Sequence, residues 1–280
     1  AQKRMAENIF AGSHNDSTDS LRMMQYYPEG DYFVCVNGKN RYTRALYGGY
    51  TDWRLETSDV PAFAIYKKNN CRSIIFSVIS KGDTLRLDNV DYCKSWYGRG
   101  KRIYELRDSR WDNKPLLITA MVNHNTEEAV FYIQPGQSWT DSLMQQATSF
   151  ADMRMQVEIM GIAREKLARN GDIGADPPGV FEPAPDRKGY KSLTYDINAA
   201  SVLTITDVDM LSVETCDPDS QGWLSAEAKM KDISQYYEDL TSRVTFITPD
   251  PYVNSIGGAL TLAADGVWDG TTWLHGAVGW

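Results

Sequence analysis

The sequence has 280 residues, of which 42% are hydrophobic and 24% charged, and its formal net charge is −8. This length and balance are typical of folded globular proteins and allow one large domain or two smaller ones. The acidic balance argues against binding to nucleic acid or to an anionic lipid surface, because both need clustered lysine and arginine. No apolar stretch approaches the roughly 18 residues of a transmembrane helix, so the sequence predicts no membrane span.

Residues 31–136 are dominated by a period of two. Short runs rich in valine, isoleucine, tyrosine and phenylalanine are separated by asparagine, aspartate, glycine or proline. Examples are DYFVCVNG at 31–38 and CRSIIFSVISKG at 71–82. Many short strands without intervening helical periods predict a mainly β fold of antiparallel sheets, arranged as a sandwich or a barrel.

The following segments mix helical, strand and loop signals. A helical stripe precedes an alternating stretch at 153–161, so we predict a short helix leading into a strand. The proline-rich stretch at 174–189 predicts a long ordered loop or flap. Strand character returns between 190 and 214, and we expect these late strands to rejoin the same sheets. The helical stripe consists of Trp139, Leu143, Ala147 and Phe150.

The period changes after residue 222, where apolar residues recur at helical spacing. One face of a helix of about five turns is predicted, as in an amphipathic helix that joins two domains. We therefore divide the chain into an antiparallel β-sandwich domain (1–222), a linker helix (223–247) and the start of a helical domain (248–280). The predicted buried stripe is Ala226, Met230, Ile233, Tyr237, Leu240 and Val244.

A further helix is predicted from Pro251. Asp250 can act as its N-cap, and proline at the first helical position loses no hydrogen bond. Gly257 and Gly258 each cost about 1 kcal/mol relative to alanine inside a helix. Close approach of another helix or of a ligand would compensate for that cost. The predicted buried stripe is Tyr252, Ile256, Ala259 or Leu260, Ala263 and Val267.

The same terminal segment carries most of the candidate site residues. Asp265 lies in the last turn of the predicted helix, where the dipole disfavours a carboxylate without a compensating partner. Asp265 and Asp269 are the candidate catalytic carboxylates. The candidate substrate-binding residues are Trp268, Trp273, His275 and Trp280.

A second group of aromatic residues lies near the ends of predicted strands, together with arginine and carboxylates. Stacked aromatic faces flanked by charged groups suit sugar rings, but the same mixture is common at the solvated edges of a sandwich. A non-catalytic glycan-binding or structural β-domain is therefore an alternative. Its sugar contacts would be Trp96 and Trp111, with Trp53 or Tyr97.

Metal and cofactor sites are not indicated by any motif. The three histidines lie far apart, and the chain has no glycine-rich phosphate loop and no Gly-x-Ser-x-Gly motif. Residues 217–228 approach a calcium loop, but Ala228 stands where calcium needs a bidentate glutamate. We interpret that stretch as a polar turn and predict no metal and no cofactor.

Four cysteines are widely spaced and form no Cys-x-x-Cys pair, which argues against a metal cluster or a redox motif. Two alternatives stay open: buried free thiols, or one or two disulfides in an oxidising compartment. The residues are Cys35, Cys71, Cys93 and Cys216.

Both ends of the chain resemble one protein family. TPDPYVNSIGGALTLAADGVWDGTTWLHGAVGW at 248–280 is similar to the opening of the catalytic domain in secreted glycosidase-like proteins of polysaccharide-degrading bacteria. NRYTRALYGGYTDWRLETSDVPAF at 40–63 is similar to their N-terminal β-domain. These proteins are related to α-L-rhamnosidases and other six-hairpin enzymes, in which a β-supersandwich is joined by a helical linker to an (α/α)6 barrel.

The resemblance implies a glycoside hydrolase that acts on a polysaccharide or oligosaccharide, in a secreted, periplasmic or cell-surface location. In six-hairpin enzymes the acid and base carboxylates lie largely after the first barrel helix. An inverting hydrolase needs two carboxyls far enough apart to admit a water. We therefore expect the isolated chain to be inactive, with carbohydrate and the remainder of its own (α/α)6 domain as its partners.

Overall fold

The structure is a computed structural model. It describes residues 23–27, 32–36, 44–46, 53–57, 60–67, 70–98, 101–123, 126–138, 150, 152–161, 189–206, 211–215, 221–254 and 256–266. The side chains of some of these residues, including all of those before Leu55, are outside the description. The predicted loop at 174–189, apart from Gly189, and most of the predicted helix at 139–150 lie outside the described residues; Phe150 is described and buried.

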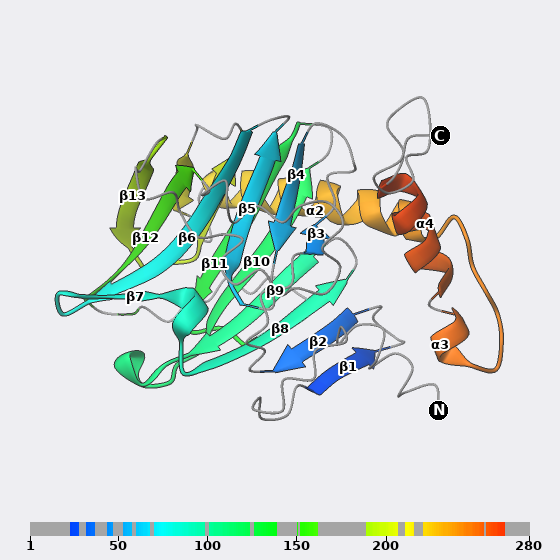
Figure 1. The fold of residues 1–280 in the computed structure, drawn as a ribbon, viewed down its shortest axis with the longest axis horizontal. Coiled ribbons are helices and arrows are strands. Elements are labelled where there is room, and N and C mark those ends of the chain that lie inside the picture. The colour runs from blue at the N-terminus through cyan, green and yellow to red at the C-terminus, as the bar shows by residue number, and fades with distance from the viewer. Residues whose placement is uncertain are drawn as a thin grey trace.

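The described strands form two antiparallel sheets that face each other (Figure 1). The eight-stranded sheet runs, in spatial order, β1 (Met23–Tyr27), β2 (Tyr32–Val36), β8 (Tyr92–Gly98), β9 (Lys101–Arg107), β10 (Leu116–Asn123), β11 (Glu128–Pro135), β14 (Ser201–Ile205) and β15 (Ser212–Thr215). The seven-stranded sheet runs β13 (Lys191–Asp196), β12 (Met153–Gly161), β6 (Asn70–Ser80), β5 (Ala62–Lys67), β4 (Trp53–Thr57) and β3 (Arg44–Leu46), with β7 (Asp83–Arg86) also pairing with β6.

This architecture confirms the predicted mainly β, antiparallel sandwich. The late strands rejoin the sheets as expected, because β13 pairs with β12 and β14 pairs with β11. The chain changes sheet between β2 and β3, β7 and β8, β11 and β12, and β13 and β14. Strands distant in sequence therefore lie side by side, such as β2 with β8 and β6 with β12.

The main core lies between the sheets and is centred on aromatic rings. Phe63 of β5 contacts Phe76, Tyr104 and Phe131 edge-on, with ring centroids 5.5, 5.6 and 5.0 Å away. These four side chains are fully or almost fully buried and come from both sheets. Edge-to-face packing of this kind adds about 0.5–1.5 kcal/mol per pair beyond the buried area.

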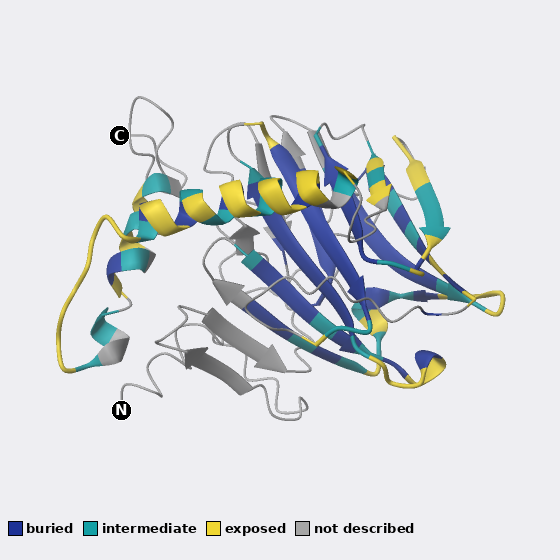
Figure 2. Cartoon of the chain, turned by 180° about the vertical axis from the view of Figure 1, so that it is seen from behind, coloured by how far each residue is buried: buried dark blue, intermediate teal, exposed yellow. Residues whose placement is uncertain are grey.

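A second core lies on the outer face of the eight-stranded sheet, beneath helix α2 (Gln221–Thr241). Figure 2 shows α2 lying across that sheet with buried and exposed residues alternating along it. The buried residues Met121, Val130, Tyr132, Ala200 and Val202 pack with Ala226, Ile233 and Tyr237 of the helix. The β10 and β11 strands are therefore buried on both faces.

Two polar contacts also hold α2 on the sheet. The Tyr132 hydroxyl donates to the backbone carbonyl of Ala226. Lys229 Nζ lies 3.3 Å from Glu128 Oε1, and both groups are partly buried. The helix that we predicted as a linker is thus packed over much of its length against the sandwich.

The predicted stripe of this helix is largely confirmed. Ala226, Ile233, Tyr237 and Leu240 are buried, and Met230 is partly buried. The prediction is wrong at Val244, which is exposed and lies beyond the end of α2 at Thr241. Residues 242–250 run outside any helix or strand, so the predicted boundary at 247 extends the helix too far.

The last described segments are α3 (Pro251–Asn254) and α4 (Ile256–Gly266). The helix begins at Pro251 as predicted, and the Asp250 carbonyl accepts from the backbone N–H of Val253 and of Asn254. Ile256 and Leu260 of the predicted stripe are 44% and 51% exposed, as expected of a helix face whose neighbours this chain does not supply. α4 instead turns its glycines toward α2. The side chains of Tyr252, Ala259 and Ala263 are not described, and Val267 lies outside the described residues.

The chain has two short 3-10 helices, η1 (Leu87–Asn89) before β8 and η2 (Ser109–Trp111) after β9. Hydrogen bonds between the residues just before β8 and those at η2 form a polar corner. The buried Asp108 carboxylate accepts from the backbone N–H of Asp91 at 3.2 Å and of Arg110 at 3.0 Å. In return, the Asp91 carboxylate accepts from Ser109 N at 3.0 Å and from Ser109 Oγ at 2.8 Å. These bonds, with Ser109 N–H contributing most, hold the pKa of Asp91 below its ordinary value.

This corner should make acid stability sensitive to Ser109. Because the pKa of Asp91 is lower in the folded state, its contribution is present above the unfolded value of about 4 and is lost as the pH falls through the folded value. Ser109→Ala removes the hydroxyl but keeps the backbone donor, so the pKa of Asp91 should rise part of the way. A carboxyl-carbon NMR titration checks this, with Ser192→Ala on β13 as the control. An unchanged Asp91 titration in Ser109→Ala would contradict it.

Candidate functional site

Of the two candidate catalytic carboxylates, the structure describes Asp265, which lies at the contact between α2 and α4. Asp265 lies near the end of α4, and its Oδ2 accepts a hydrogen bond from the Tyr236 hydroxyl of α2 at 3.1 Å. The compensating partner that the sequence required for a carboxylate in a last helical turn is therefore present. Five other predicted site residues lie outside the described residues: Trp268, Asp269, Trp273, His275 and Trp280.

Tyr236 is kept in its protonated, donating form. Burial raises its pKa to about 12, with the neighbouring Asp265 carboxylate as the second cause, while Arg243 acts in the opposite direction. The phenol therefore donates to Asp265 across the neutral range. This geometry links two helices.

The glycine pair lets α4 approach α2 closely. A Cβ on Gly257 would lie 2.3 Å from the Val244 carbonyl oxygen, and a Cβ on Gly258 would lie 3.2 Å from Thr241 Cβ. The sequence argument that these glycines serve close approach of another helix is confirmed for Gly258 against Thr241 of α2. Gly257 approaches the segment that directly follows α2.

Exposed apolar side chains surround this contact. Ile247 is 93% exposed, and Ile256 and Leu260 project from the face of α4 away from the glycines. Phe246 is exposed and lies beside Gly257, since its Cδ2 atom is 3.5 Å from the position of a Cβ there. We call this set the apolar strip: Val244, Phe246, Ile247, Ile256 and Leu260.

The segment that carries part of the strip is held by a polar clasp. Thr248 N–H donates to Asn254 Oδ1 at 2.7 Å, and Asn254 Nδ2 donates back to the Thr248 carbonyl at 3.0 Å. The Thr248 hydroxyl lies 2.8 Å from Asn254 Oδ1 and 3.0 Å from the Asp250 carbonyl oxygen, and its one proton can be donated to either acceptor. The turn before α4 is therefore fixed by side-chain bonds.

The two tryptophans of the alternative glycan-binding site are buried. Trp96 is 5% exposed with Lys94 Nζ 4.7 Å from its ring centre. Trp111 is 3% exposed, donates Nε1–H to the Lys114 carbonyl at 2.9 Å, and stacks with Phe150. Neither indole presents an open face to a sugar, so burial argues against this alternative at both positions. The side chains of Trp53 and Tyr97 are not described.

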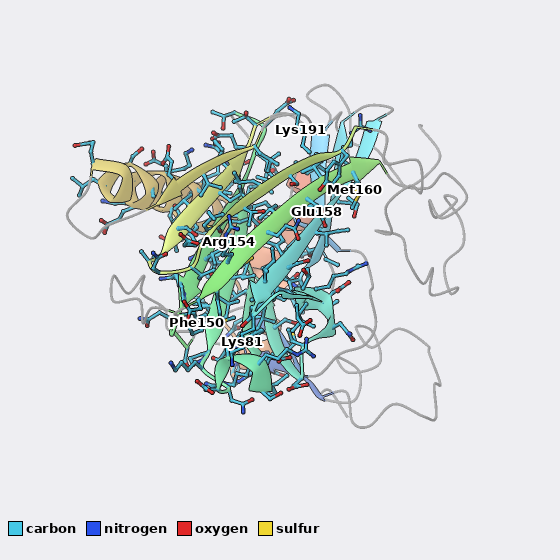
Figure 3. All side chains as sticks on the ribbon, turned by 90° about the vertical axis from the view of Figure 1, so that its left-hand side faces the viewer. Lys81, Phe150, Arg154, Glu158, Met160 and Lys191 are labelled. Atoms are coloured by element: carbon cyan, nitrogen blue, oxygen red, sulfur yellow. The ribbon has the colours of Figure 1, made fainter. Side chains whose placement is uncertain are left out.

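A polar face on β12 and β13 is a feature that the sequence reasoning did not single out as a site. Figure 3 shows Arg154 and Glu158 along β12. Glu158 accepts from the Tyr190 hydroxyl at 2.8 Å, and Arg154 forms an exposed ion pair with Asp196 at 3.5 Å. The alternation in MRMQVEIMG already placed these polar residues on the outer face, but alternation alone does not separate a binding face from a solvated one.

The two carboxylates of this polar face are too far apart for paired acid–base work. Glu158 lies opposite Ser192, and Arg154 lies opposite Asp196, so four strand residues separate the two acids. At about 3.3 Å per residue this is roughly 13 Å, beyond the roughly 6.5–9.5 Å of an inverting glycosidase. The face therefore provides surface ion pairs and hydrogen bonds.

Metal, thiol and membrane features are limited within the described part of the chain. There, no three histidine, cysteine or carboxylate groups come together to hold a metal ion. The Cys93 side chain is buried; the side chains of the other three cysteines are not described. The described helices are too short or too polar to cross a bilayer.

Comparison with known proteins gives a family. No curated protein matches the sequence. A family model described as a domain of unknown function, DUF4450, matches residues 71–246. The matched range runs from β6 to just past α2, so it takes in strands of both sheets and the helix that covers one of them. Since the match covers more than half of the chain, this protein belongs to the DUF4450 family.

Proposed function

We propose that this chain forms the β-sandwich and the first helical segment of a glycoside hydrolase, and that its own part in that enzyme is to dock and support a helical domain. The substrate class would be a polysaccharide or oligosaccharide, with hydrolysis by general acid–base chemistry on an activated water. A secreted, periplasmic or cell-surface location goes with this proposal, which rests on the resemblance of residues 40–63 and 248–280.

The observation that carries the docking role is the apolar strip. It combines Ile256 and Leu260, which are spaced as one face of α4, with Val244, Phe246 and Ile247 of the segment between α2 and α3. Exposed apolar side chains that adjoin an existing helix contact suit further helices packed against α4. The occupant that we assign to the strip is the remainder of the helical domain.

The fixed geometry beneath the strip supports this role. α2 packs on the sheet through the second core, and the Tyr132 hydrogen bond and the Lys229–Glu128 ion pair add to that contact. α4 packs closely on α2 at Gly258, and the Tyr236–Asp265 hydrogen bond joins the two helices. The sandwich thereby sets the direction of α4, and with it the position of any helix that packs on the strip.

Asp265 fits better as a tie between helices than as an acid or base. Its hydrogen bond to Tyr236 occupies one carboxylate oxygen, and the tyrosine proton is held too tightly for acid–base exchange near neutral pH. As in the six-hairpin enzymes that the terminal segment resembles, the acid and base would lie after the first barrel helix, and Asp269 and the terminal tryptophans stay candidates for one edge of the pocket.

Hydrolysis assays test the proposal. The 280-residue chain should give no turnover on a panel of aryl glycosides and polysaccharides, whereas protein produced with the coding sequence that follows Trp280 should hydrolyse at least one of them. In that longer protein, Ile256→Glu with Leu260→Glu should strongly reduce activity. The near-ultraviolet circular dichroism spectrum should stay unchanged, which would show that the sandwich is still folded. Turnover by the 280-residue chain, or full activity in the double variant, would overturn it.

A further inference from the structure

We draw no further inference here: the strongest candidate, the exposed apolar strip of Val244, Phe246, Ile247, Ile256 and Leu260 beside the α2–α4 contact, belongs to the docking surface already described under the proposed function.

Discussion

Gly257→Ala is expected to displace α4 from the segment that directly follows α2, although alanine in place of a helical glycine ordinarily stabilises a helix by about 1 kcal/mol. The added Cβ would meet the Val244 carbonyl oxygen at 2.3 Å, and that oxygen belongs to the backbone, which cannot rotate away. Overpacking of this kind costs about 1–3 kcal/mol. At about 2 kcal/mol, the amides of α4 should exchange with solvent roughly 30-fold faster.

Hydrogen exchange followed by mass spectrometry measures this directly. Leu260→Ala, compared at a concentration at which the chains are monomeric, is the matched control, because Leu260 lies on the exposed face of the same helix and should shift stability by no more than about 0.5 kcal/mol. Exchange in α4 that is slower in Gly257→Ala than in the native chain would show that the glycine is not needed for the contact.

Tyr237→Ala is expected to destabilise the whole sandwich, not only α2. Tyr237 is almost fully buried in the second core, and its ring contacts Tyr236 edge-on at 5.3 Å. Removing a large aromatic side chain from a core costs about 3–5 kcal/mol. Because the helix covers apolar residues of β10, β11 and β14, its loss would expose Met121, Tyr132 and Val202.

Urea unfolding followed by tryptophan fluorescence tests this second expectation. The native chain should unfold in one transition that moves to lower urea in Tyr237→Ala, while Leu224→Ala, on the exposed side of α2, should leave the midpoint nearly unchanged. A sandwich transition unaffected by Tyr237→Ala would mean that α2 is a linker that the sheet does not need.

Hydrophobic periodicity was sufficient for the fold class. The period of two predicted the strands, and the helical period of 226–240 predicted which face of α2 is buried, because both signals are local. Periodicity could not predict the order of the strands in each sheet. Alternation shows which face of a strand is buried but not which strand it pairs with, and here β2 pairs with β8 and β11 with β14.

The packing of α2 on the sheet had a signal that the domain division did not use. LLITAMVN in β10 is apolar on both faces, which is typical of a strand buried on both sides. This two-sided apolar pattern predicts a further element that covers the outer face of the sheet. The helix 223–247 was instead interpreted as a linker from its amphipathic pattern alone.

The candidate site was less predictable than the fold. The close approach of Gly257 and Gly258 followed from their unfavourable helix propensity, and the need of Asp265 for a partner followed from the helix dipole. Which face of α4 packs on α2 could not be predicted, because glycines leave no apolar signature and the stripe of Ile256 and Leu260 pointed the other way. Trp96 and Trp111 were predicted as possible sugar contacts because they lie near charged residues, but both side chains are buried.

Self-association of the 280-residue chain tests the docking role of the apolar strip most directly. Sedimentation velocity at increasing concentration should show dimers or larger species, and Ile256→Glu with Leu260→Glu should restore a monomer without lowering the urea midpoint. Leu224→Glu, an exposed leucine elsewhere on α2, should leave the association unchanged. A native chain that stays monomeric at every concentration and behaves like the double variant would contradict the claim that this strip is a docking surface.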